Sequence, residues 1–327
     1  MRNSKITAIV LSAIIGIGVG TGGTLVYENN QEAKQISKLE QTTKANAVEE
    51  IVKGNVLATL WQQNSGEVKA LRYEAYNSGK RYVDELVKEP TAKPYAVTLD
   101  IDETIIDNSP HAGYEIKHNE LFSKENFGEW VQMADAAAID GAKDFTDYAK
   151  SKGFEVFYVS NRSEEKELDA TIKNMQKLGF VNSDKDHILL KTDTSSKDAR
   201  WNKIKENYNL AIYCGDNLGD FPDGYDNKSN EQRREIVDKE AQFFGTKYIV
   251  LPNPTYGDFE NAVYGYDFKK SPEQNQSLKS LKINCNNHNS IVFHNLELII
   301  FICFITFEIR YYFFLIYNIL LVFLFAL

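Results

Sequence analysis

Between residues 95 and 251 the sequence alternates short apolar runs with longer stretches of helical periodicity. Strands that alternate with helices need crossover connections, which favour a parallel sheet with helices on both of its faces. We therefore predict an α/β fold in which a parallel sheet is flanked by helices. The runs that we expect to form its strands are Tyr95–Ile101, Phe154–Ser160, His187–Leu190, Leu210–Gly215 and Lys247–Leu251.

One of the intervening helices has recognisable ends. Ser163 suits an N-cap, and the acidic residues that follow it favour the positive end of a helix. Leucine, isoleucine and methionine then recur at helical spacing, and Gly179 suits the C-terminus. The pattern predicts a helix over Ser163–Leu178.

Upstream of the sheet the sequence predicts two further helices. An amphipathic pattern covers Ala45–Leu60, and a second helical stretch over about Ser65–Lys88 is closed by Pro90. Both would pack on the flank of the sheet. Residues 28–44 are polar and rich in Gln, Lys and Glu, which predicts a linker. We place the main domain at residues 45–275.

The two ends of the chain differ in composition from its middle. Residues 1–27 contain Arg2 and Lys5 followed by the apolar run Ile6–Val26, which is typical of a signal peptide or an N-terminal membrane anchor. Positive charge stays on the inner side, so we expect an exported protein that is tethered to the membrane. Residues 276–327 form an atypical apolar tail that resembles read-through of frameshifted sequence, and we assign it no function.

Polar side chains gather at the carboxyl ends of the predicted strands. Ligands of parallel sheets bind at this edge, so we expect these side chains to meet in one site. The residues are Asp100, Asp102 and Thr104 after the first strand, Ser160 and Asn161 after the second, Lys197 after the third, and Asp216 and Asp220 after the fourth.

The types of these residues suit phosphoryl transfer. Carboxylates that converge repel one another, so a divalent cation is expected between them. Oxygen ligands without His or Cys favour Mg²⁺. Beside such an ion Asp100 can attack phosphorus, and Asp102 can protonate the departing alkoxide. Lys197 and the Ser160 hydroxyl would hold the phosphate oxygens.

The motifs stand in the order found in phosphatases of the haloacid dehalogenase (HAD) type. They are DxDxT from Asp100, the strand-end Ser160, Lys197, and GDNxxD with its acids at Asp216 and Asp220. More narrowly, the segments LDIDETIIDNSP, VSNR, SSKDARW and CGDNLGDF resemble bacterial class C acid phosphatases of the lipoprotein e family. Flanking segments extend the resemblance over about residues 50–270.

The resemblance implies a fold and a catalytic apparatus. The fold is a HAD-like Rossmannoid sheet with a small, mainly helical cap insertion at about residues 105–140. Asp100 would form an aspartyl-phosphate, with Asp102 as acid and base. Mg²⁺ would bind to the carboxylates of Asp100 and Asp216 and to the backbone carbonyl of Asp102, with Asp220 in support.

The resemblance also implies a substrate class. Similar proteins dephosphorylate 5′-nucleotides, including nicotinamide mononucleotide, and stack the base between aromatic residues. Trp130 and Tyr256 are the matching residues here, and Ser160, Asn161 and Lys197 would bind the phosphate. Two alternatives share these motifs: a cell-surface protein that binds nucleotides without turnover, and a phosphotransferase.

Charge and cysteine content limit the other possibilities. The formal net charge of −9 argues against nucleic acid as a partner, because phosphate backbones are bound by clustered Lys and Arg. The lipoprotein e family usually carries a lipid on a Cys just after the signal peptide, and this chain has no Cys before Cys214. Cys214 itself lies in an apolar run, so we interpret it as a core residue.

Seven further polar residues lie in or near the motifs. Four of them either contact the substrate or hold the acidic motifs in place, and the sequence leaves both roles open. They are Asp107, Asn108, Arg162 and Arg200. The other three are interpreted as structural or exposed, because carboxylates already supply the acid–base groups. They are His111, His118 and His187.

Overall fold

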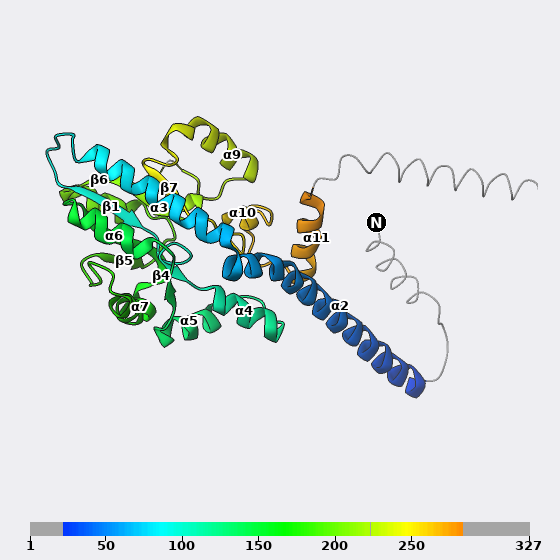
Figure 1. The fold of residues 1–327 in the computed structure, drawn as a ribbon. Helices are drawn as coiled ribbons and strands as arrows, with labels where there is room; N and C mark the ends of the chain where they lie inside the picture. The colour runs from blue at the N-terminus through cyan, green and yellow to red at the C-terminus, as the bar shows by residue number, and fades with distance from the viewer. Residues whose placement is uncertain (1–21, 223, 284–327) are drawn as a thin grey trace, which may run out of the picture. The chain divides into compact units, whose positions relative to one another are not determined.

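A five-stranded sheet forms the centre of the molecule. The computed structural model describes residues 22–222 and 224–283. The strand order is β5-β4-β1-β6-β7, and every neighbouring pair is parallel, as predicted (Figure 1). The first residue of each strand lies within one residue of the first residue of a predicted apolar run. The strands are β1 (Tyr95–Leu99), β4 (Glu155–Ser163), β5 (Ile188–Lys191), β6 (Asn209–Gly215) and β7 (Tyr248–Val250).

Helices cover both faces of this sheet. Successive side chains of a strand point to opposite faces, so neighbouring residues of β1 enter different core clusters. Val97 packs in the cluster that contains Tyr76 and Phe145, whereas Ala96 packs in the cluster that contains Trp201. The helices that supply these clusters are α3 (Gly66–Leu86), α6 (Ala142–Ser151), α7 (Glu164–Leu178), α8 (Asp198–Asn207) and α9 (Asn230–Lys239).

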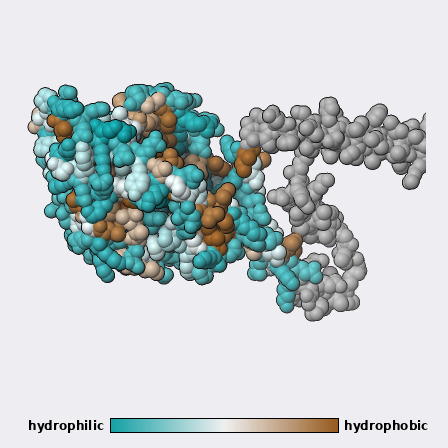
Figure 2. All heavy atoms as spheres, viewed as in Figure 1, coloured by the Kyte–Doolittle hydropathy of each residue, from teal (hydrophilic) through white to brown (hydrophobic). Residues whose placement is uncertain are grey.

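Burial in these clusters leaves a mostly polar exterior. The face seen in Figure 2 is largely hydrophilic, and its apolar residues form separate patches. The predicted core position of Cys214 is confirmed, because this residue is 1% exposed within the sheet. Burial raises the pKa of its thiol well above the usual value, which leaves it protonated and unsuited to nucleophilic attack.

β1 places the first acidic residue at the middle of the sheet's edge. It lies between β4 and β6, and its pairing with β6 continues past its end. The backbone N–H of Asp100 donates to the carbonyl of Cys214 at 2.9 Å. Asp100 therefore sits in fixed backbone geometry at the carboxyl edge of the sheet, where the neighbouring strands also end.

The predicted limits of α7 are confirmed. Ser163 is the N-cap and its hydroxyl accepts from the backbone N–H of Lys166 at 3.3 Å. Gly179 ends the helix with φ +75°, a left-handed conformation that glycine adopts without steric cost. The cap matters for the site because it fixes the chain immediately after β4.

The N-terminal helix is longer than the pattern predicts. α2 runs from Gly22 to Asn64 as a continuous helix, so residues 28–44 form helix instead of an irregular linker. Side chains from Lys34 to Asn46 are exposed. Gln, Lys, Glu and Ala all have high helix propensity, so this stretch can be helical without a buried apolar face.

Both chain ends fall mostly outside the described residues. This applies to the predicted signal peptide or anchor at 1–27 and to most of the predicted tail at 276–327. α11 covers Pro272–Lys282, and contacts divide the chain into units 1–278 and 279–327, of which the first contains the sheet. Of the helices that can be described, none combines the length and apolarity needed to cross a bilayer.

A small insertion separates β1 from β4, at the position predicted for a cap. Its two short strands pair antiparallel and its two helices lie beside the carboxyl end of β4 (Figure 1). Asn174 of α7 donates to the carbonyl of Ala136 at 3.0 Å and so attaches the base of the insertion to the sheet's helices. The elements are β2 (Ile106–Asp107), α4 (Ser109–His118), α5 (Lys124–Met133) and β3 (Ala137–Ala138).

Candidate active site

Three acidic residues converge at the carboxyl ends of β1 and β6, as the sequence predicted. Asp100 follows β1, Asp216 follows β6, and Asp220 ends the 3₁₀ helix Leu218–Asp220. One carboxylate oxygen from each lies within 4.8 Å of the others. Three oxygens at this spacing, with no His or Cys among them, suit a hard divalent cation.

Lys197 brings an ammonium group to the same acids. It is 3% exposed, and its Nζ donates to Asp220 Oδ1 at 2.6 Å and to Asp100 Oδ1. Burial raises the pKa of Asp100 to about 7, an effect that Lys197 opposes and Asp220 strengthens. Burial, with Asp220 and Asp100 nearby, also raises the pKa of Asp216 well above its usual value. One ammonium group leaves three carboxylates short of positive charge, so the residues present fit a bound divalent cation.

The carboxylate of Asp216 is oriented by two neutral donors. The Thr104 hydroxyl donates to Oδ1 at 3.2 Å, and the Asn253 amide donates to Oδ2 at 2.9 Å. Thr104 belongs to the predicted DxDxT motif, whereas Asn253 was not predicted. It stands just after β7, another parallel strand that ends at this edge, and this position was the available signal.

Gly215 allows Asp220 to approach the end of β6. A Cβ atom at Gly215 would lie 2.2 Å from the Cβ of Asp220, which is closer than two carbon atoms can pack. Only glycine therefore fits between the strand and the returning acid.

We expect Gly215→Ala to lower kcat by about 100-fold, since a displacement of roughly 1 Å at a catalytic group can have this effect. Steady-state hydrolysis of a phosphate monoester measures it. Gly54→Ala is the matched control, because a Cβ at Gly54 meets nothing within 4 Å. Full activity of Gly215→Ala would show that Asp220 need not stand where the structure has it.

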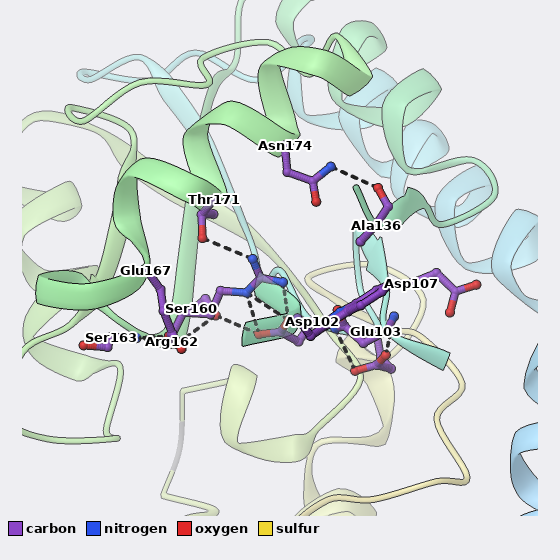
Figure 3. A network of polar contacts seen from close by, with 12 residues as sticks. Asp102, Glu103, Asp107, Ala136, Ser160, Arg162, Ser163, Glu167, Thr171 and Asn174 are labelled. Carbon is purple, nitrogen blue, oxygen red and sulfur yellow. Dashed lines mark hydrogen bonds and ion pairs between the residues drawn. The ribbon is translucent and has the colours of Figure 1, made fainter. Parts of the chain in front are cut away.

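Arg162 holds the second aspartate of the motif. Its Nε and a terminal nitrogen donate to Asp102 Oδ1 at 3.0 and 2.7 Å, and its other terminal nitrogen donates to Thr171 at 3.1 Å (Figure 3). The Ser160 hydroxyl lies 3.4 Å from Asp102 Oδ2. The Asp102 carboxylate is thus fixed beside the cluster rather than within it, which leaves its backbone carbonyl as the predicted ligand. Of the two roles that the sequence left open for Arg162, the structure supports holding an acidic motif in place.

Arg200 likewise positions a strand end. It donates to the carbonyl of Ser160 at 2.5 Å and to the amide oxygen of Asn161 at 2.8 Å. The side chain of Asn161, predicted to bind phosphate, is exposed and engaged by Arg200. Ser160 is 1% exposed and lies inside the site. The structure therefore brings Ser160 to the acids and places the Asn161 side chain at the rim.

A comparison with protein families agrees with this geometry. The model of the HAD superfamily, subfamily IIIB (acid phosphatase), matches residues 21–259. The chain belongs to this family. The match spans the sheet, the cap insertion and every acid of the cluster, so the phosphatase family and the α/β fold predicted from the sequence are confirmed.

Solved and curated acid phosphatases extend the comparison. The class C acid phosphatase from Bacillus anthracis is 37% identical with a TM-score of 0.70, covering 72% of this chain and 99% of that structure. Its tungstate-bound form is 36% identical with a TM-score of 0.69, at the same coverage. Acid phosphatase 1 of Solanum lycopersicum is 28% identical over 131 residues, 38% of this chain and 50% of that protein. The stem 31 kDa glycoprotein of Glycine max is 31% identical over 130 residues, 37% of this chain and 50% of that protein. The chain thus spans about half the length of these curated relatives.

In this acid phosphatase family member, the two predicted aromatic residues both form hydrogen bonds in or near the DxDxT motif. Trp130 of α5 is half-buried, and its Nε1 donates to the Asn108 amide oxygen at 2.8 Å. Tyr256 is 45% exposed, and its hydroxyl donates to Glu103. Glu103 was part of the DxDxT motif but had no predicted role, because sequence spacing does not show where its side chain points.

Asp107 and the three histidines named in the sequence analysis have structural contacts in this phosphatase fold, as the sequence suggested for the histidines. Asp107 accepts from the backbone N–H of Ser109 at 2.9 Å and so shapes the start of α4. His111 is 7% exposed, and burial lowers its pKa. His118 bonds to a backbone carbonyl of α4, and His187 lies 2.7 Å from an Asp184 oxygen. Asp107 therefore takes the structural role of its two alternatives.

Proposed function

We propose that this chain is a Mg²⁺-dependent acid phosphatase that forms an aspartyl-phosphate on Asp100. The observation that carries the proposal is the position of Asp100 at the carboxyl end of β1. There it bonds to Lys197 and lies within 4.8 Å of carboxylate oxygens from Asp216 and Asp220. A carboxylate in this position, paired with the buried ammonium group of Lys197, suits attack on a phosphate monoester.

The reaction has two steps on these residues. First, a carboxylate oxygen of Asp100 forms a bond to phosphorus while the ester oxygen leaves, and Asp102 gives that oxygen a proton. Second, a water molecule attacks the same phosphorus and gives a proton to Asp102, which frees Asp100 and releases phosphate. Lys197 offsets negative charge on the phosphate oxygens in both steps. Arg162 keeps Asp102 in reach of the leaving oxygen.

The metal ion would be held by the acidic cluster. Asp100 and Asp216 would offer carboxylate oxygens, the Asp102 backbone carbonyl would be the third protein ligand, and Asp220 would support them. When bound, Mg²⁺ would lower the repulsion between these carboxylates and the phosphate oxygens. Oxygen ligation of this kind favours a small, hard cation.

The proposed substrates are 5′-nucleotides, including nicotinamide mononucleotide. The resemblance to class C acid phosphatases supports these substrates. So do the hydrogen bonds that Trp130 and Tyr256 form in or near the DxDxT motif. Stacking between aromatic rings would hold the base while the phosphate enters the acidic cluster. Phosphate release in water, compared with transfer to an added alcohol, separates hydrolysis from phosphotransfer.

We expect removal of the metal to abolish activity. After treatment with EDTA the protein should lose hydrolysis of p-nitrophenyl phosphate, and added Mg²⁺ should restore it. Ca²⁺ should restore far less, because its ligand distances are about 0.3–0.5 Å longer than those of Mg²⁺. Full activity in EDTA would remove the metal from the mechanism. Tight nucleotide binding without phosphate release by the Mg²⁺-loaded protein would favour the binding-protein alternative.

We also propose that the protein acts outside the cytoplasm, tethered through residues 1–27. The support is the sequence alone: Arg2 and Lys5 precede the apolar run Ile6–Val26. Fractionation of cells that express the full chain tests this proposal. Recovery of the protein in the cytosolic fraction would contradict it.

A further inference from the structure

Glu103 is a buried acid that the proposed reaction does not use. It lies between Asp102 and Thr104, is 2% exposed, and has φ +55°. Residues other than glycine seldom adopt this left-handed conformation, and they keep it only where surrounding contacts hold it. Here the backbone N–H of Glu103 donates to the carbonyl of Ile106 at 2.9 Å. The surrounding contacts therefore direct this side chain away from solvent.

The Glu103 carboxylate joins two distant parts of the chain. Its Oε1 accepts from the backbone N–H of Asn108 at 2.9 Å. Its Oε2 accepts from the Asn108 amide at 3.4 Å and from the hydroxyl of Tyr256. Tyr256 comes from the loop after β7, whereas Asn108 lies in the cap insertion as the N-cap of α4. A single carboxylate thus connects the two segments that carry the aromatic residues.

Asn108 extends this connection to the catalytic acid. It is 4% exposed, its amide oxygen accepts from Trp130 Nε1 at 2.8 Å, and its amino group donates to Asp102 Oδ1 at 2.8 Å. An indole N–H can only donate, so it fixes the amide oxygen toward Trp130. The amino group must then face the carboxylates of Asp102 and Glu103. Every polar atom of the Asn108 side chain is used in this arrangement.

We propose that Glu103 and Asn108 act as one positioning unit. The unit holds the side chains of Tyr256 and Trp130 in fixed positions relative to the Asp102 carboxylate. The aromatic rings would contact the base of a nucleotide, and Asp102 would protonate its ribose oxygen. The unit thus links recognition of the leaving group to its protonation. This inference rests on the proposed function, which supplies the role of Asp102.

The link predicts a dependence on the leaving group. The 5′-oxygen of a nucleoside is a poor leaving group, so its departure needs a well-placed acid. p-Nitrophenolate is a good leaving group that departs with little help from an acid. Misplacing Asp102 and the aromatic rings should therefore slow hydrolysis of AMP much more than hydrolysis of p-nitrophenyl phosphate.

The test compares variants that keep each aromatic ring and weaken the contacts that position it. Tyr256→Phe and Glu103→Gln should each lower kcat/KM for AMP about tenfold, the effect of one hydrogen bond to a charged group. For p-nitrophenyl phosphate the loss in kcat/KM should be clearly smaller than for AMP, because its leaving group needs less help from an acid. The loss in the double variant should be smaller than the product of the two single losses, because both substitutions alter the one contact between residue 103 and Tyr256. Tyr148→Phe is the matched control, since its hydroxyl donates to the Asp84 carboxylate at 2.6 Å, away from the acidic cluster.

Three results would overturn the proposal. They are equal losses on both substrates, additive losses in the double variant, and unchanged hydrolysis of AMP. Tyr256→Phe alone carries the test if Glu103→Gln does not fold, because it keeps the ring and removes only the hydroxyl that donates to Glu103. Failure of the proposed function would look different, since the wild-type protein with Mg²⁺ would then hydrolyse neither substrate.

Discussion

Asp100→Asn is expected to lower kcat for p-nitrophenyl phosphate by about 10⁴-fold or more, the scale of losses when a covalent nucleophile is removed. The amide has the shape of the carboxylate but does not attack phosphorus. It still offers an oxygen to the Nζ of Lys197, so the protein should fold normally. Activity at pH 5 to 6 with Mg²⁺, followed by a thermal melt of the same sample, measures both expectations.

The control for this substitution is Asp107→Asn. It makes the same chemical change seven residues away and keeps an oxygen for the N–H of Ser109, which Asp107 bonds at 2.9 Å. The side chain of Asp107 points away from Asp102 (Figure 3). Activity should stay near that of the wild type. Wild-type turnover by Asp100→Asn itself would contradict the covalent mechanism.

Lys197→Met is expected to reduce both activity and stability. The ammonium group is 3% exposed and bonds to Asp100 and Asp220. Removing one partner of a buried ion pair typically costs about 3–5 kcal/mol, because the other charge stays buried without compensation. We expect a loss of this size in the free energy of unfolding of the metal-free protein. kcat should fall by on the order of 10³-fold, since charge on the transferring phosphoryl group is no longer offset.

Urea denaturation with and without Mg²⁺ separates the two effects of Lys197. A cation that binds only the folded protein adds stability, so Mg²⁺ should recover part of the loss in Lys197→Met. Lys203→Met is the matched control, because Lys203 lies on α8, the helix that Lys197 precedes as its N-cap, and its side chain is exposed. Unchanged stability of metal-free Lys197→Met would show that the acids do not depend on this ammonium group.

The sheet could be predicted because buried parallel strands read as continuous apolar runs. The convergence of Asp100, Asp216 and Asp220 could be predicted because parallel strands end at one edge of the sheet, and Lys197 also lies at this edge. The length of α2 could not, because a polar helix without a buried face has the composition of a linker. Residues 28–44 illustrate this: their propensity favours helix, but their periodicity gives no signal.

The fine arrangement of the site was beyond the sequence for a different reason. Whether Arg162 and Arg200 bind substrate or hold the motifs depends on side-chain directions across separate elements, and spacing along the chain does not give these directions. The same limit hid the contact of Asn253 with Asp216. It also hid the role of Glu103, which stands inside the best-defined motif.

The central claim is that Asp100 takes up the phosphoryl group. Mixing the Mg²⁺-loaded protein with substrate, quenching with acid within one turnover and mapping peptides by tandem mass spectrometry tests it directly. The account predicts one added phosphoryl group, located on Asp100 and absent from Asp100→Asn. A phosphoryl group on any other residue, or turnover with no phosphorylated peptide at any quench time, would contradict it.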